Sequence, residues 1–240
     1  MAAKVSPPAS PVTLVEYAAG RLRDEILSGE LPTGTHINLD RTAQRLGMSP
    51  IPVREALRIL EAERIVISIR QRGYTVSQVT VQDLDEIYRL RFLLEPLAVE
   101  LAVPRLTDEQ IAQLESDLLL LDDAFARNDW DAHRRYHRAF HFGIYTPCGS
   151  PHLLRFLEVL WVNSQRYQRI TTRLKGELEQ RAREHHLIFA ACRAREVKQA
   201  AGLMHDHVRR ALDVIRDALL ADAGGLAETS MPAVAKGAIR

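Results

Sequence analysis

Apolar side chains recur at helical spacing over most of the chain, beginning close to its N-terminus. Residues 12–27, 39–46 and 53–60 each place their apolar positions on one stripe, which predicts three short helices. Ser49 and Pro50 precede the third stripe and supply a hydroxyl cap and a first-turn proline. Three short helices in close succession predict a helix-turn-helix.

A strand pattern follows directly. Residues 65–69 and 74–77 are rich in β-branched and aromatic side chains, and they flank a glycine-containing tip at 70–73. This arrangement is typical of a β-hairpin. A helix-turn-helix followed by a hairpin predicts a winged helix-turn-helix.

From residue 80 to about residue 221 the apolar spacing is helical again, over six long segments, so we expect a second, all-helical domain. Beyond Ala223, glycines and a proline break the period, which predicts a disordered tail. The expected fold is mainly α, and the expected divisions are a flexible arm at 1–11, a winged domain at 12–79, a helical domain at 80–222 and a tail at 223–240.

Composition excludes several classes of protein. Hydrophobic residues make up 46% of the chain and charged residues 26%, which argues against wholesale disorder and disulfide scaffolds. The net charge is only +1, so any nucleic-acid surface must be local. The two cysteines, Cys148 and Cys192, lack metal-ribbon spacing and are compatible with a reducing compartment. No apolar run reaches membrane-spanning length and no signal peptide is evident, so we expect a cytoplasmic protein without a membrane partner.

Arginines gather on the third helix and on the wing. Arg54 and Arg58 are four residues apart and share a face turned away from the apolar stripe, while Arg70 and Arg72 lie at the wing tip. Forked guanidinium donors suit the phosphates of a DNA duplex. A solvated charged surface explains the same residues, and local charge does not decide between the two. The order of helices, capped arginine-bearing helix and basic wing favours DNA binding.

The same region resembles the winged helix-turn-helix of GntR-family bacterial transcription regulators, through residues 27–34, 43–58 and 72–74. The resemblance implies that Ser49, Arg54 and the wing around Gly73 face DNA. Many members carry arginine directly after the serine, where this chain has Pro50, which shifts the expected base readout to Arg54 and Arg58. The predicted DNA-contacting set is Ser49, Arg54, Arg58, Arg70, Arg72 and Gly73.

Eight of the nine histidines lie in the helical domain. His133, His137 and His141 are spaced by four residues and therefore descend one stripe of one helix. Any single histidine on such a face is most often a hydrogen-bonded core or surface residue. A stripe of three is harder to explain in that way.

Two further histidines meet this stripe only if the chain reverses. His185 and His207 are 22 residues apart, or about 33 Å along one continuous helix. A helical hairpin with its apex near Glu196 would bring the two rings level and facing His137 and His141. The sequence therefore predicts four imidazoles around one point.

The helical domain resembles the FCD (FadR-like) subgroup of the GntR family, an antiparallel helical bundle, through residues 91–95, 140–141, 149–151, 184–185 and 204–207. Many members bind a divalent metal through an acidic residue and three histidines. The resemblance assigns those histidines to His141, His185 and His207, and it places His137 at the acidic position. His137 is therefore the fourth candidate ligand.

Replacing the acidic ligand by an imidazole leaves both charges of the ion uncompensated, so the site should attract an anion more strongly. Imidazole-rich coordination suits Zn, Ni or Cu better than Mg or Ca. The resemblance implies that an arginine on the first bundle helix lines an effector pocket, so Arg91 is the candidate for a carboxylate. An ordinary ion pair with Glu95 is the alternative. Polarity within an apolar run adds Asn163 and Arg166 as candidate effector contacts.

These observations predict a homodimeric, ligand-responsive transcription regulator, expected to be a repressor, that binds operator DNA, a divalent metal and a small carboxylate. Two alternatives stay open: a sensor for which the metal itself is the signal, and a metal-dependent enzyme. The enzyme is the weaker one, because the chain has no HExxH segment and no evident pairing of two histidines with one carboxylate. We therefore expect no catalytic residues.

Overall fold

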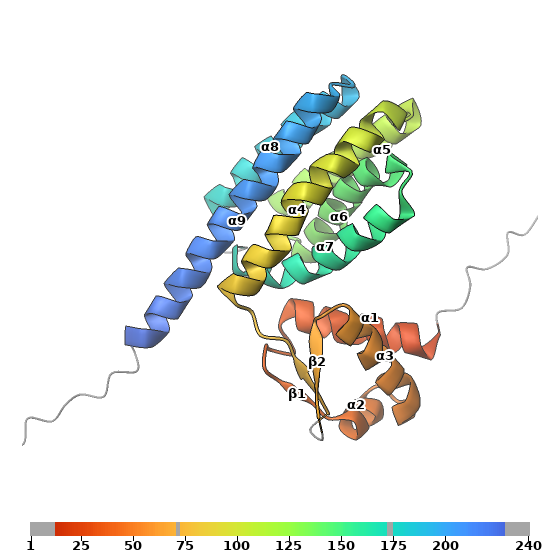
Figure 1. Ribbon diagram of the computed structural model, residues 1–240, viewed down its shortest axis with the longest axis vertical. Helices are drawn as coiled ribbons and strands as arrows, with labels where there is room; N and C mark the ends of the chain where they lie inside the picture. The colour runs from red at the N-terminus through yellow and green to blue at the C-terminus, as the bar shows by residue number, and fades with distance from the viewer. Residues whose placement is uncertain (1–12, 71–72, 172–174, 229–240) are drawn as a thin grey trace, which may run out of the picture. The chain divides into compact units, whose positions relative to one another are not determined.

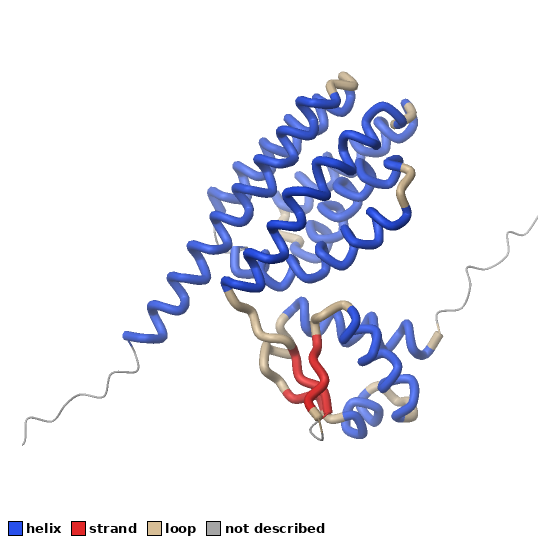
Figure 2. The backbone as a smooth tube through the Cα atoms, in the orientation of Figure 1, coloured by secondary structure: helices blue, strands red, loops and turns tan. Residues whose placement is uncertain are grey.

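The structure is a computed structural model that describes residues 13–70, 73–171 and 175–228. The chain divides into two compact units, residues 1–79 and 80–240. The first contains three helices and a small sheet, and the second is helical (Figures 1 and 2). The expected fold class, mainly α with a winged helix-turn-helix and an all-helical bundle, is confirmed.

The first unit is built from α1 (Leu14–Ser28), α2 (Leu39–Arg45) and α3 (Pro50–Ala62). Its sheet has the order β1-β3-β2 and is antiparallel throughout. The predicted hairpin is β2 (Val66–Ile69) with β3 (Gly73–Val76), and the unpredicted strand is β1 (His36–Ile37). Two residues are too short to show a strand period, which is why sequence patterning missed β1. The fully buried core includes Leu22, Val53, Leu57, Leu60, Ile65 and Val76.

The start of α3 differs from the expectation. Ser49 is the N-cap residue, but within the described part of the chain its side chain makes no capping hydrogen bond. A cap hydroxyl accepts from the second or third backbone N–H of the helix. The third position is Pro52, which has no N–H, so the usual donor is missing.

Gly73 opens β3 in the left-handed region, with φ +81°. A Cβ there would lie 3.3 Å from Cε1 of His36 on the adjoining strand. The left-handed backbone therefore favours glycine at this corner of the wing, and the His36 side chain would have to shift slightly to admit a Cβ. Arg72 lies outside the described residues.

The second unit consists of α4 (Val81–Ala102), α5 (Asp108–Ala126), α6 (Trp130–Tyr145), α7 (Pro151–Thr171), α8 (Lys175–Arg193) and α9 (Val197–Glu228), with short 3-10 turns at Val103–Arg105 and Thr146–Cys148. The six segments predicted from periodicity correspond to these six helices. In Figure 1, α4 and α9 lie side by side along the bundle, and α8 and α9 form the predicted hairpin. None of the described helices is long and apolar enough to span a bilayer.

Helix boundaries follow local signals. Thr107 and Gln110 form a capping box at the start of α5, and Ser150 accepts a hydrogen bond from the backbone N–H of Leu153 at the start of α7. The expected break at Ala223 is wrong, because α9 continues to Glu228. Glycine lowers helix propensity by only about 1 kcal/mol, so Gly224 and Gly225 do not by themselves end a long helix. Residues 229–240 and 1–12 lie outside the described range.

Candidate functional site

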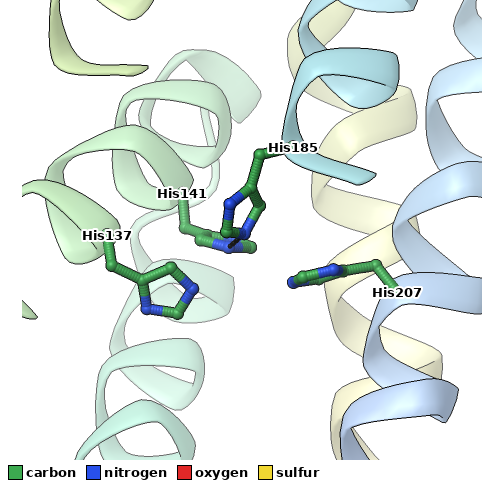
Figure 3. A group of neighbouring side chains, drawn as sticks. All are labelled: His137, His141, His185 and His207. Atoms are coloured by element: carbon green, nitrogen blue, oxygen red, sulfur yellow. Dashed lines mark hydrogen bonds between the residues drawn. The ribbon is translucent and has the colours of Figure 1, made fainter. Parts of the chain in front are cut away.

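Four buried histidines converge in the helical unit. His137 and His141 come from α6, His185 from α8 and His207 from α9. One ring nitrogen of each lies within 4.8 Å of the others. Figure 3 shows the four rings turned toward a common centre from three helices. The convergence predicted from spacing is present.

The hairpin accounts for this meeting. α8 ends at Arg193 and α9 begins at Val197, so the chain reverses at the predicted apex. The ring centroids of His185 and His207 lie 4.7 Å apart, and Nε2 of His185 lies 3.2 Å from Nε2 of His141. The remaining stripe residue, His133, stacks on His137 at 6.0 Å and lies outside the four-histidine group.

Hydrogen-bond partners outside the cluster determine which ring nitrogen of His141 and of His207 faces the centre of the cluster. Nδ1 of His207 lies 2.8 Å from a Glu184 oxygen, and a carboxylate can only accept, so this nitrogen carries the proton. Nδ1 of His141 lies 3.0 Å from the Tyr145 hydroxyl, which itself donates to Glu95 at 2.7 Å. The hydroxyl therefore accepts from Nδ1 of His141. In both rings the Nε2 lone pair is left facing the cluster.

Burial keeps the cluster neutral. Desolvation lowers the pKa of His137, His141 and His185 well below the ordinary value, and neighbouring imidazoles and arginines lower it further. Burial also lowers the pKa of His207, although Glu184 opposes that shift. Neutral imidazole is the form that binds a metal ion.

The donor set fits a transition metal. Buried Nε2 of His137 and buried Nδ1 of His185 have no hydrogen-bond partner among the described residues. Unmet buried nitrogens are costly, and a cation near the common centre would engage imidazole lone pairs. Nitrogen ligands suit Zn, Ni or Cu rather than Mg or Ca. These four residues can therefore hold a divalent ion of that class.

Arg91 lies beside the cluster and is 2% exposed. Its Nε donates to Glu95 at 2.5 Å, so the ion pair considered from the sequence exists. Burial opposes the charge of Arg91, but Glu95 holds the pKa of the guanidinium above its ordinary value. Nη1 is also buried and has no partner in the described part of the chain. The ion pair therefore leaves one arm of the guanidinium available to a ligand.

The other two candidate effector residues lie in different surroundings. The side-chain amide of Asn163 donates to the carbonyl of Val159, one turn earlier in α7. Arg166 pairs with Asp83 at 3.3 Å near the start of α4. Both are buried, and the contacts seen for them are to protein groups.

Sequence reasoning missed several residues around the cluster. Glu184 points away from its neighbour His185 on a helix, which gives it no evident role in the sequence, yet it supports His207 on the neighbouring helix. Tyr145 continues the stripe of His133, His137 and His141 at the same four-residue spacing, so the sequence pattern alone could have placed it beside the cluster. Trp161 packs 5.1 Å from the rings of both His137 and His141, and only tertiary structure reveals that contact.

The first unit presents its arginines outward. Arg54 and Arg58 are exposed on α3, and Ser49, Arg70 and Gly73 are exposed as well. Arg58 pairs with Glu55 at 2.9 Å, whereas Arg54 makes no ion pair with any described residue. α3 buries Val53, Leu57 and Leu60, so its opposite face is free to enter a groove.

Comparison with known proteins gives consistent matches over both units. Residues 14–76 match the family described as "Bacterial regulatory proteins, gntR family", and residues 86–210 match "FCD domain". The chain is 32% identical to the HTH-type transcriptional repressor GlaR of Escherichia coli, covering 82% of this chain and 94% of that protein. It is 32% identical to the HTH-type transcriptional regulator McbR of the same organism, covering 77% of this chain and 85% of that protein. A solved structure of E. coli McbR/YncC superposes with a TM-score of 0.77 at 28% identity, covering 86% of this chain and 98% of that one.

Proposed function

Because the chain belongs to the GntR family of bacterial regulatory proteins and carries an FCD domain, we propose that it is a metal-dependent, ligand-responsive repressor. That it is a DNA-binding transcription regulator, and not an enzyme, follows from the family itself. The metal, the effector and the direction of regulation are the proposed parts. The observation that carries them is the buried four-histidine cluster beside an incompletely paired arginine.

The proposed DNA-contacting residues are Ser49, Arg54, Arg58, Arg70, Arg72 and Gly73. Exposed arginines on α3 support this set, since guanidinium forks bind phosphate and guanine edges. Arg54 is the main candidate, because Arg58 already shares its charge with Glu55.

In the helical unit, His137, His141, His185 and His207 would hold a Zn or Ni ion. Glu184 and Tyr145 support this assignment, because they orient the rings of His207 and His141. A bound ion would supply a Lewis-acidic point for an oxygen of the effector. The free arm of Arg91 would take a carboxylate oxygen. Asn163 and Arg166 stay in the proposed effector set, although their present contacts to Val159 and Asp83 would have to be exchanged.

A homodimer is also proposed. α4 exposes a stripe of leucines at helical spacing, Leu90, Leu93, Leu97 and Leu101, with exposed fractions between 37% and 66%. A second copy with the same stripe would cover it in a two-fold arrangement, which suits a palindromic operator.

The effector would act by binding the DNA-competent and DNA-released states with different affinity. A coupling of about 1 to 3 kcal/mol changes operator affinity by roughly 5- to 150-fold. Such a change is sufficient for regulation without any chemical reaction.

The test begins with metal content. Elemental analysis of the purified chain should give about one Ni or Zn per protomer after loading. His141→Ala should abolish the metal, whereas the exposed His152→Ala, a matched control, should retain it. A His141→Ala protein with full metal content would overturn the proposed centre.

Operator response is measured next, by fluorescence anisotropy on a duplex selected from a random palindromic library. Small carboxylates added to the metal-loaded chain should change its affinity for that duplex. The metal-sensor alternative is favoured by one observation, namely that all four ligands come from protein and are buried, as in closed sites. If Ni or Zn alone releases the duplex and no carboxylate changes affinity, the sensor replaces the effector-binding repressor.

A further inference from the structure

An isoleucine lies among charged residues on the outer face of α3. The inner face of this helix is fully buried and consists of Val53, Ala56, Leu57 and Leu60. Residues three or four apart share one face of a helix. The face opposite the core therefore carries, in order, Ile51, Arg54, Glu55 and Arg58. Ile51 is 70% exposed, whereas Ile59 near the other end of the helix is 38% exposed.

The first turn of α3 differs in composition from those of the other helices of its unit. The first turns of α1 and α2 contain Glu16 and Asp40, which the positive end of a helix dipole favours. The first turn of α3, residues 50–53, contains no acidic residue, and its second position is Ile51. Isoleucine is also a weaker helix former than straight-chain residues. Local helix stability therefore does not account for this residue.

The surroundings of Ile51 identify the partner that would cover it. Single apolar side chains are common on protein surfaces, so exposure alone says little. Arg54 and Arg58, however, lie on the same face and favour a negatively charged partner. The chain belongs to a family of DNA-binding regulators, so that partner is a DNA duplex.

The edges of the bases in the major groove offer one kind of apolar group. Guanine, cytosine and adenine present hydrogen-bond donors and acceptors there, whereas thymine adds a C5-methyl group. An isoleucine side chain can pack on that methyl group. It cannot accept a hydrogen bond from the amino group of cytosine, so that group would lose its water partner without gaining another. An isoleucine in the groove therefore favours thymine over cytosine.

We propose that Ile51 is a specificity-determining residue that contacts the C5-methyl group of a thymine in each operator half-site. The inference rests on the proposed function, because it assumes that the outer face of α3 enters the major groove. It adds a base-reading residue to the proposed DNA-contacting set. Pro50 and Pro52, on either side of Ile51, have no N–H and so offer no backbone donor that would compete for the same base edge.

The experiment removes the methyl group from the DNA and the isoleucine from the protein. In the palindromic duplex selected with the parent chain, each thymine is replaced in turn, in both half-sites together, by deoxyuridine, which lacks only the methyl group. Binding is measured by fluorescence anisotropy at fixed salt for the parent, Ile51→Ala, Ile51→Val, Ile59→Ala and Arg54→Ala. Ile59→Ala is the matched control, because it removes the same atoms from the same helix away from the first turn.

At one thymine position, the parent and Ile59→Ala should bind the deoxyuridine duplex about fourfold or more weakly than the unmodified one, as burial of one methyl group provides. Ile51→Ala should bind both duplexes equally, because the methyl group has lost its partner. Ile51→Val, which keeps a branched apolar side chain, should retain most of the difference. Arg54→Ala should bind both duplexes more weakly and keep the difference between them. The melting temperature of Ile51→Ala should match that of the parent, because the side chain is exposed.

Two results would overturn the inference and leave DNA binding in place. A folded Ile51→Ala that keeps the full difference shows that another group contacts the methyl group. A parent chain that tolerates deoxyuridine at every position shows that no thymine methyl group is contacted. A different pair of results removes the proposed placement of α3, and the inference falls with it: a parent that selects no duplex, or an Arg54→Ala that binds as tightly as the parent.

Discussion

Glu184 offers the sharpest test of how the proposed metal centre is held. Its carboxylate accepts from Nδ1 of His207 at 2.8 Å and also contacts Arg210 at 3.5 Å. It thereby fixes the tautomer of His207 and makes the imidazole a stronger donor. Removing such an outer partner typically lowers metal affinity by about 10- to 100-fold, or roughly 1.4 to 2.7 kcal/mol.

Two substitutions separate charge from hydrogen bonding. Glu184→Gln keeps an acceptor for the Nδ1 proton but loses the negative charge, so we expect about a tenfold loss of Ni or Zn affinity. Glu184→Ala removes both, and we expect a loss near the upper limit, about 100-fold. The exposed Glu179→Gln on the same helix removes an equal charge away from the cluster and serves as the control.

The assay is competition for the ion with a chromogenic chelator at constant pH and salt, with the melting temperature of each metal-free variant as a folding check. Unchanged affinity in a folded Glu184→Ala would refute the reasoning, since His207 would then not depend on Glu184. An equal loss in Glu179→Gln would assign the effect to general charge instead of to the His207 contact.

Three further predictions follow. Arg54→Ala should weaken binding to the selected duplex by roughly 5- to 150-fold, measured by anisotropy at fixed salt, while the control Arg127→Ala in the other unit should not weaken it. Equal affinities of Arg54→Ala and the parent chain for the duplex would contradict the role of Arg54. Tyr145→Phe leaves an oxygen of Glu95 and Nδ1 of His141 without their partner. The free energy of unfolding of the metal-free chain, measured in urea, should therefore fall by about 1 to 3 kcal/mol. An unchanged free energy of unfolding would show that water replaces the hydroxyl. The pKa of His137, His141 and His185 lies well below 6.5, so the unfolded chain takes up protons first as pH falls. The free energy of unfolding of the metal-free chain should therefore be greatest above about pH 6.5. Below that pH it should decrease by up to about 1.4 kcal/mol per histidine per pH unit. A constant free energy of unfolding between about pH 7.5 and 5.5 would argue against buried neutral rings.

Local signals in the sequence predicted most of the fold. Capping residues such as Thr107 and Ser150 act within one turn of their own helix, so their effect is visible without tertiary structure. The same reasoning failed at Ser49, although Pro52 could have shown that its donor was absent. It also failed at the end of α9, because two glycines weaken a helix without ending it.

The candidate site was predictable to the extent that it depends on periodicity. A four-residue step and one reversal are enough to place His137, His141, His185 and His207 together. The groups that support these histidines were not predictable, because the rotation of a helix about its axis decides which neighbouring side chain a residue contacts. Glu95 reaches Tyr145 across 50 residues of sequence, and Glu184 on α8 reaches His207 on α9.

The prolines at the start of α3 have a consequence for how this end of the helix can touch DNA. Helix N-termini commonly bind phosphate through free backbone amides, which act whatever the side chains are. Pro50 and Pro52 remove two of the first three amides and leave that of Ile51. In the proposed complex, affinity for the phosphates at this point of the duplex therefore comes from serine and arginine side chains. Single substitutions of those side chains should then lower DNA affinity more than they would in a helix whose backbone amides also bind phosphate.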